Sequence, residues 1–365
     1  MNEKETHMKA GVLYGPGDLR FESVELPAPR SGEALVKIRA NGICGSDIHF
    51  FESGRLGPFV VDRPYIPGHE AVGEIVDFGS AGGKAGARTV ADGAGNELSV
   101  GRRVVIEPSI PCRRCDYCKR GLYNLCRDVV FLSAPPVNGT FGEFVAHSAD
   151  FLFAVPDRLT DEEAALVEPV SVGVHACNRA TLRPGASVAI VGAGPIGLIT
   201  LLVAKAYGAG RCVMVDLDEN RLNVARSLGA DAVVAVSDAS DTVAEATEAA
   251  GSSGATFVFD ASGSSAGCAT AVKIAAPAGV VTIIGWPERS SFEYPVETII
   301  ERELDVRGIN RYRNTYPTAI ELMQSGRIDV KPLVTHRFGF DEIVPAFEYA
   351  STHRDETVKV LVVNS

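Results

Sequence analysis

Ser187-Val-Ala-Ile-Val-Gly-Ala-Gly-Pro-Ile-Gly197 joins a short apolar run to a glycine-rich turn, and a second apolar segment follows as far as Tyr207. The first run has the length and composition of a buried strand, and the later segment has those of a helix. In such a turn one glycine makes the bend, a second lets a ligand approach the backbone, and a third lets the helix pack closely. Since a helix N-terminus attracts an anion, a pyrophosphate is predicted to bind at Gly192, Gly194, Pro195, Ile196 and Gly197.

The alternation of strand and helix continues beyond this turn. Strands are expected at 212–215, 256–259 and 280–284, and helices at 198–207 and 221–228. A chain that alternates in this way folds into a parallel sheet covered by helices. A packed turn without a ligand is the alternative, but it does not explain why strand, glycines, helix and an acidic residue occur in register.

The acidic residue is Asp216, which ends the strand after the glycine-rich turn. A carboxylate at this distance accepts hydrogen bonds from the ribose hydroxyls of a dinucleotide, and no Arg or Lys follows directly to bind a 2′-phosphate. The sequence therefore predicts NAD rather than NADP as the cofactor. Arg221 is a further predicted cofactor contact, with an ordinary exposed helical Arg as the alternative.

Short β-rich runs separated by Gly and Pro make up the chain from Met8 to about residue 155, for example at 34–39 and 71–76. This texture predicts a mostly β domain. Residues 1–8 are expected to form a tail, and residues 80–101 a surface hairpin or loop without a chemical role. About the last fifty residues return to a mixed α/β texture and are expected to pack on the first domain.

Two short motifs of the first domain supply thiolate, imidazole and carboxylate for one metal. They are Cys44-Gly-Ser-Asp-Ile-His49 and Gly68-His69-Glu70. A mixed set of three sulfur, nitrogen and oxygen ligands suits zinc, and it leaves the fourth position free for water or substrate, as in catalytic zinc sites. Cys44, His69 and Glu70 are therefore the expected ligands of a catalytic zinc.

A second metal site is expected from the C-x2-C-x2-C-x7-C cluster of Cys112, Cys115, Cys118 and Cys126. Four thiolates surround one tetrahedral ion and close it off, so this zinc would be structural. The alternative, four unligated thiols in a cluster, is the rarer case. The remaining cysteines, Cys177, Cys212 and Cys268, lie among apolar or small residues and are expected to pack as small hydrophobes.

Composition excludes several classes of function. Of the 365 residues, 46% are apolar and 22% charged, which suits two globular domains. The net charge of −11 argues against binding to nucleic acid or to an anionic membrane, because both need clustered Lys and Arg. The sequence has no signal-peptide core, membrane-spanning run or disulfide framework. A small-molecule substrate and a cytoplasmic location are therefore expected.

Taken in order, these motifs resemble those of the zinc-dependent medium-chain alcohol dehydrogenase family over essentially the whole chain. The resemblance is strongest to the polyol dehydrogenases of the sorbitol, xylitol and L-arabinitol type. Besides the metal and glycine motifs, it rests on Val167-Glu-Pro-Val-Ser-Val-Gly173, Arg311-Tyr-Arg-Asn-Thr-Tyr-Pro317 and Lys331-Pro-Leu-Val-Thr-His336.

The resemblance implies an α/β protein with three segments. Residues 1–169 would form a GroES-like, mostly β catalytic domain that includes the four-cysteine lobe. Residues 170–311 would form a Rossmann NAD-binding domain with a doubly wound parallel sheet, and residues 312–365 would return to the catalytic domain. The active site would lie in a cleft between the two domains.

The resemblance also implies roles for residues around the metal. Cys44, His69 and Glu70 match the zinc ligands of the polyol dehydrogenases. Glu168 matches the acid near the zinc-bound water, although some relatives use that position as the ligand instead of Glu70. Ser46 and His49 match the relay through which the alcohol proton leaves, and Asp47 is expected to orient a ligand.

Substrate and nicotinamide contacts follow from the same resemblance. Substrate contacts are expected from Phe50, Glu168, Arg311 and Tyr312, and cofactor contacts from Ile284, Gly285 and Trp286. Phe50 stands where polyol dehydrogenases often have Tyr, so one hydroxyl contact is expected to be missing and the substrate to be less polar or longer. The turn Gly101-Arg102-Arg103-Val104 carries Arg where relatives commonly have Asp, a change expected to affect stability or assembly rather than catalysis.

The implied function is the reversible oxidation of a secondary hydroxyl of a polyol to the ketose, dependent on zinc and NAD, by a homotetramer or homodimer. Zinc would stabilise the alkoxide, and hydride would pass to the nicotinamide. The alternative among enzymes is another zinc-dependent dehydrogenase, acting on 2,3-butanediol, threonine or a simple secondary alcohol. A dinucleotide-binding protein without activity is the alternative outside enzymes, and the intact Cys44, His69, Glu70 and Glu168 argue against it.

Overall fold

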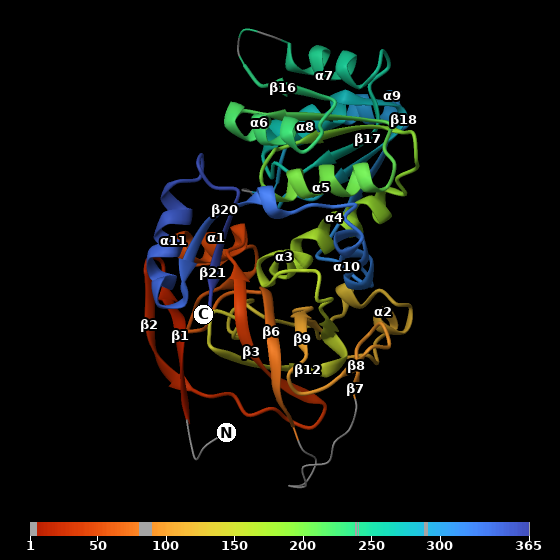
Figure 1. Ribbon diagram of the computed structural model, residues 1–365. Coiled ribbons are helices and arrows are strands. Elements are labelled where there is room, and N and C mark those ends of the chain that lie inside the picture. The colour runs from red at the N-terminus through yellow and green to blue at the C-terminus, as the bar shows by residue number, and fades with distance from the viewer. Residues whose placement is uncertain (1–5, 80–89, 238, 240, 288–290, 365) are drawn as a thin grey trace. The chain divides into compact units, whose positions relative to one another are not determined.

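The structure is a computed structural model that describes residues 6–79, 90–237, 239, 241–287 and 291–364 (Figure 1). The chain forms two compact units. Unit 1 contains the residues up to Glu168 and those from Val334 onward, and unit 2 contains Pro169–Leu333. The sequence-based boundary before the C-terminal segment stands at 311/312, whereas in the structure residues 312–333 belong to unit 2. They include helix α10 (Tyr316–Gln324), which lines a groove together with the end of helix α5 (Pro195–Ala206).

Unit 1 is built on a seven-stranded sheet that brings distant segments together. Its order is β13 (Leu152–Ala154), β9 (Arg103–Ile106), β6 (Glu70–Phe78), β3 (Glu33–Gly42), β21 (Lys359–Val363) and β20 (Val334–Gly339), and β12 (Phe144–Ser148) also pairs with β3. All neighbours are antiparallel except β20 and β21. Strands β3 and β6 contain the predicted runs 34–39 and 71–76. The C-terminal strand β21 therefore lies directly beside β3 (Figure 1).

Two apolar clusters hold unit 1 together. One lies on the sheet and includes Val36, Ile38, Ile75 and Ile106. The other gathers helix α1 (Gly45–Ser53), helix α11 (Ile343–Thr352) and the hairpin of β1 (His7–Gly15) and β2 (Asp18–Glu25) around aromatic side chains such as Phe51 and Phe347. Helix α1 begins directly after Cys44, so the first metal motif forms the N-terminal part of this helix.

The four-cysteine lobe, residues 112–126, projects from a small hairpin. Strands β10 (Ser109–Ile110) and β11 (Val130–Phe131) pair at its base, and helix α2 (Asp116–Lys119) and the 3-10 turn η1 (Tyr123–Leu125) lie within it. Strands β7 (Val90–Ala91) and β8 (Glu97–Leu98) form a hairpin within the predicted loop 80–101, whose residues 80–89 lie outside the described residues. Of the predicted N-terminal tail, residues 1–5 lie outside them too, and β1 begins at His7.

Unit 2 is a six-stranded, fully parallel sheet. Its order is β16 (Ala232–Ala235), β15 (Arg211–Asp216), β14 (Ser187–Val191), β17 (Ala255–Asp260), β18 (Ala275–Ile283) and β19 (Asp305–Gly308). The chain starts at the centre and builds outward in both directions. Right-handed crossovers therefore place α5 and α6 (Glu219–Ser227) on one face, and α7 (Thr242–Ala250) and α8 (Ser265–Ile274), which contact each other, on the opposite face. The predicted α/β class with a doubly wound sheet is confirmed.

Helix and strand bounds in unit 2 follow from local chemistry. Strand β14 covers the predicted 187–191, and α5 begins at Pro195 because proline suits the first helical turn. Asp218 caps α6 by accepting the N–H groups of Asn220 and Arg221. In the described part of the chain, no helix combines the length and the apolar character that a membrane crossing requires.

Arg103 joins β9 to the segment before helix α3 (Asp161–Ala165). Its guanidinium donates to Asp161 at 2.7 Å and to the carbonyl oxygens of Pro156 and Leu159 at 3.1 and 2.9 Å. These bonds are made within unit 1, and the expected effect of this turn on stability or assembly stays a prediction.

We predict that Arg103→Ala lowers the free energy of unfolding by about 1–3 kcal/mol, because it leaves partly buried acceptors without a donor. The matched control is Arg226→Ala, which removes an exposed pair with Glu219 and should change stability by about 0.5 kcal/mol or less. Urea unfolding of both variants checks this. Equal losses in the two variants would contradict the assignment.

Candidate active site

Cys44, His69 and Glu70 converge in unit 1. One ligand atom of each residue lies within 4.8 Å of the other two. Cys44 precedes the first turn of α1, while His69 and Glu70 stand at the start of β6, and the two latter side chains are buried. The ring Nδ1 of His69 has no hydrogen-bond partner although it is buried. A half-buried thiol together with a buried imidazole and a buried carboxylate at this separation fits a zinc ion.

Asp47 holds the loops that carry these ligands. It is fully buried, and its carboxylate accepts the backbone N–H of Cys44 at 3.0 Å and that of Gly68 at 3.2 Å. Its Oδ1 lies 3.7 Å from Nδ1 of His69. Burial alone would raise the pKa of Asp47, but His69 and these donors hold that pKa below its usual value. One charged carboxylate thus fixes both ligand-bearing segments, as expected for Asp47 from its position.

Lys359, which the sequence analysis did not identify, forms a buried ion pair with Glu70. Its Nζ donates to both carboxylate oxygens at 2.8 Å and to the carbonyl oxygen of Ile43 at 3.3 Å. The side chains of Lys359 and Glu70 are 3% and 1% exposed. Burial would lower the pKa of Lys359, but Glu70, and to a lesser extent Cys44, raises it above its usual value, so the ammonium stays charged.

The sequence did contain a signal for Lys359, a single charged residue inside the apolar run of β21. Gly42 makes room for the pair from the neighbouring strand β3. A β-carbon on Gly42 would lie 2.1 Å from Oε2 of Glu70, so any larger residue there would displace the carboxylate.

Glu168 lies in the first turn of α4 (Val167–Ala180) and is buried. Its charge contributes to raising the pKa of both Lys359 and Glu107, so the carboxylate faces the same surroundings as Glu70. Glu107 was not predicted. Burial raises the pKa of Glu107 to about 8, against the effect of a hydrogen bond from the hydroxyl of Tyr123 at 2.7 Å. Burial thus favours the protonated form of Glu107.

The predicted relay and substrate residues lie in different settings. Ser46 and His49 are one turn apart on α1, with Ser46 half-buried and His49 exposed. Phe50 points into the core of unit 1, where its ring meets that of Tyr65 at 6.2 Å between centroids. In unit 2, Arg311 has a left-handed backbone with φ 54°.

Tyr312, also in unit 2, is 1% exposed and packs on Tyr316. For Ser46, His49, Phe50, Arg311 and Tyr312 the catalytic and substrate roles stay predictions. His147, which lies outside both metal motifs, is buried and donates from Nε2 to the carbonyl oxygen of Glu107 at 2.8 Å, and burial lowers the pKa of His147 to about 4.

The four cysteines of the lobe also converge, with one sulfur of each within 4.8 Å of the others. The sulfur of Cys118 lies 3.4 Å from that of Cys115 and 3.9 Å from that of Cys112. Thiolates at about 2.3 Å from a tetrahedral zinc stand roughly 3.8 Å apart, so this spacing fits the ion. Cys177, Cys212 and Cys268 are buried in unit 2, as expected, but the thiol of Cys268 does not pack only as a small hydrophobe, because it donates to Asp260 at 2.7 Å.

The glycine-rich turn of unit 2 has the geometry that a pyrophosphate needs. Gly192 has φ 99°, and a β-carbon on Gly197 would lie 1.8 Å from the carbonyl oxygen of Gly192. Gly194 has open space where its side chain would be, directly at the N-terminus of α5. The backbone can therefore approach an anion there, and the turn fits a dinucleotide.

Asp216, at the end of β15, holds the backbone of this turn in place. Its carboxylate accepts the N–H of Ala193 at 2.5 Å and that of Asp218 at 2.8 Å. Arg221 is half-buried, with Nε 3.7 Å from Asp218. Ile284, Gly285 and Trp286 follow β18, and Trp286 is exposed. The contacts of these residues with a cofactor stay predictions.

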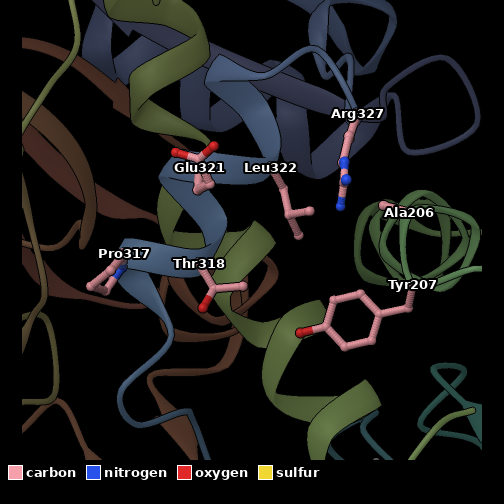
Figure 2. A pocket seen from close by; sticks show the side chains of 7 residues that line it. All are labelled: Ala206, Tyr207, Pro317, Thr318, Glu321, Leu322 and Arg327. Atoms are coloured by element: carbon pink, nitrogen blue, oxygen red, sulfur yellow. The ribbon is translucent and has the colours of Figure 1, made fainter.

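Unit 2 also has an open groove of about 620 Å³ between the end of α5 and helix α10 (Figure 2). The side chains of Tyr207, Thr318, Leu322 and Arg327 line it. The groove contains none of the metal ligands and no residue of the glycine-rich turn, so we assign it no part in the active site.

Comparison with known proteins agrees with this geometry. The family model of the alcohol dehydrogenase GroES-like domain matches residues 30–157, and that of the zinc-binding dehydrogenases matches residues 195–325. Sorbitol dehydrogenase of Bacillus subtilis is 38% identical, with 98% of this chain and 97% of the relative covered. L-idonate 5-dehydrogenase of Vitis vinifera is 40% identical, with 96% and 93% covered.

A solved structure, that of 2R,3R-butanediol dehydrogenase from Bacillus subtilis, superposes with a TM-score of 0.86 at 32% identity and covers 98% of this chain and 100% of that one. The chain belongs to the zinc-dependent medium-chain alcohol dehydrogenase family. Within that family, its likeness to sorbitol dehydrogenases over nearly the full length places it in the polyol dehydrogenase subgroup.

We predict that Lys359→Met destabilises the zinc-depleted protein by about 3–5 kcal/mol, because it leaves Glu70 as a buried carboxylate without a partner. Excess zinc should restore more stability to the variant than to the wild type, since the ion compensates the same charge. Urea unfolding with and without zinc measures both effects. Lys205→Met, which breaks a half-exposed pair with Asp231, is the control and should cost about 1 kcal/mol or less. A similar cost in both variants would argue against the buried pair.

Proposed function

We propose that this protein oxidises a secondary hydroxyl of a polyol to the ketose, with NAD as hydride acceptor, and catalyses the reverse reduction. The convergence of Cys44, His69 and Glu70 within 4.8 Å carries this proposal. Relatives named for sorbitol and L-idonate support a polyhydroxylated substrate. The similar butanediol dehydrogenase supports the alternative, a shorter diol or simple secondary alcohol.

The proposal assigns each residue a part. Cys44, His69 and Glu70 would hold a catalytic zinc, with Glu168 as the alternate third ligand, and the four lobe cysteines would hold a structural zinc. When bound, zinc supplies Lewis acidity that makes an alcohol easier to deprotonate, and the nicotinamide accepts the hydride. Ser46 would take up the alcohol proton and pass it to His49, which is exposed one turn further on α1 and can release it to solvent.

Other residues keep the site in order. Lys359 compensates the charge of Glu70, and Asp47 holds the segments of both motifs. In unit 2, Gly192, Gly194 and Gly197 would receive the pyrophosphate, and Asp216 would select NAD by repelling a 2′-phosphate. A homo-oligomer, a tetramer or a dimer, in the reducing environment of the cytoplasm completes the proposal, with the eight cysteines as free thiols or metal ligands.

A substrate panel tests the function. Purified protein is incubated with sorbitol, xylitol, L-arabinitol, galactitol and 2,3-butanediol, each with NAD or NADP, and NADH or NADPH formation is recorded. We expect NAD reduction with a sugar alcohol, and we expect a zinc chelator to abolish it. Activity confined to the butanediol would favour the alternative, and silence with every substrate in the zinc-loaded protein would count against both.

His69→Ala tests the role of the metal group separately. It removes a ligand from unit 1 and leaves the glycine-rich turn of unit 2 unchanged. We predict that turnover falls below about one thousandth of the wild-type rate, which corresponds to a loss of more than about 4 kcal/mol of transition-state stabilisation, while NADH affinity measured by fluorescence stays within about twofold. If the His69→Ala protein were active, the reaction would not need zinc at this site.

Asp216→Ser tests cofactor choice. Loss of the carboxylate should lower kcat/KM with NAD at least about tenfold and should shift the NAD to NADP preference by a similar factor toward NADP, because the repulsion of the 2′-phosphate disappears. Asp231→Ser is a matched control, because Asp231 also accepts a backbone N–H, from Cys212 in the same strand β15. It should leave the preference unchanged. An unaltered preference in Asp216→Ser would overturn the role of Asp216.

A further inference from the structure

Ser133 lies between the two segments that carry the predicted metal ligands, although it belongs to neither motif. It follows strand β11, on the stretch of chain that leaves the four-cysteine lobe, and it is 3% exposed. No function described above uses it.

The hydroxyl of Ser133 makes two buried hydrogen bonds. It accepts the backbone N–H of Gly68, the residue before His69, at 2.9 Å. It donates to Oδ1 of Asp47 at 2.9 Å, and Asp47 in turn accepts the N–H of Cys44. One hydroxyl therefore connects, directly or through Asp47, the backbone of both ligand-bearing segments.

The backbone of Ser133 indicates that the side chain matters. Its φ is 69°, in the left-handed region where residues other than glycine are uncommon. Holding such a residue there costs free energy, and the conformation persists only where the surroundings fix it. Glycine would adopt this backbone conformation at a lower cost in free energy. The hydroxyl group is therefore the feature that serine contributes at this position.

The same strand brings a second contact to His69. The ring of Phe131 lies 5.6 Å from the ring of His69 between centroids. The lobe above this strand is tied to the body of unit 1 through the hydrogen bond from Tyr123 to Glu107 and through the pairing of β10 with β11. The lobe thus fixes residues 130–133, from which Phe131 lies beside His69 and Ser133 bonds to Gly68 and Asp47.

We propose that Ser133 is a positioning residue for the three-ligand metal site, acting through Gly68 and Asp47 on the placement of His69 and Cys44. The four-cysteine lobe serves as the anchor of strand β11 and of the turn after it, which carries Ser133. This inference rests on the proposed function only for its kinetic consequences, because metal binding can be measured without a substrate.

The decisive variant is Ser133→Gly, which removes the hydroxyl and relieves the backbone at the same time. Affinity is measured by titrating protein depleted of metal at the three-ligand site with Co²⁺, whose visible spectrum reports its coordination. We expect affinity to fall about 10–100-fold, as for the loss of groups that orient metal ligands. We also expect kcat for the polyol to fall with little change in KM, and the stability of the metal-depleted protein to stay level or rise.

Two further variants make the result decisive. Ser133→Ala lacks the hydroxyl but keeps the unfavourable backbone, so it should lose the same metal affinity and also lose stability. Ala278→Gly relieves a left-handed backbone with φ 57° at an exposed position of unit 2, and it should leave metal affinity unchanged. Wild-type Co²⁺ affinity in both Ser133 variants would overturn the proposal. A wild-type protein that binds the metal but oxidises no polyol would instead overturn the proposed function and leave the role of Ser133 standing.

Discussion

The buried pair of Glu70 and Lys359 is the constraint on which the arrangement of unit 1 depends. Two unit charges withdrawn from water are costly unless each finds the other in good geometry, and here both carboxylate oxygens receive the same ammonium at 2.8 Å. This requires β21 to lie beside β3, and it requires glycine at position 42. The return of the chain end to the first domain is thus tied to the charge balance of the metal site.

Around this pair, the site is held by main-chain contacts more than by side-chain packing. Asp47 accepts N–H groups from both ligand-bearing segments, and Ser133 supports the same carboxylate from the strand that leaves the lobe. Backbone donors are fixed by the fold and cannot rotate away, so such contacts restrict the positions of Cys44 and His69 more firmly than contacts between flexible side chains would. The glycine-rich turn of unit 2 follows the same logic, because the carboxylate of Asp216 holds the N–H of Ala193.

Features with a local periodic or turn signal were predicted well from the sequence. A short continuous stretch of sequence is enough to identify strand β14, the glycine-rich turn or the acidic end of β15. The fold class follows from these three features. Helix α1 was not predicted, because its apolar positions, Ile48, Phe50 and Phe51, do not follow a helical stripe and only tertiary packing buries them. The end of the Rossmann segment was placed at 311, while the structure keeps α10 in unit 2, where that helix and the end of α5 line the same groove.

The metal ligands themselves were predictable because their chemistry is rare and their spacing is short. Lys359 and Ser133 were not, because each meets its partners only in the folded chain, across a long sequence separation. One consequence concerns the order of events during synthesis. Lys359 is made 289 residues after Glu70, so a nascent chain carries Cys44, His69 and Glu70 long before their counter-charge exists. Until β21 joins the sheet, Glu70 has no buried ammonium to meet it, and any ion captured early would sit in a site of different charge. The charge balance around the expected metal site is therefore complete only when the last strand of the chain has joined the sheet.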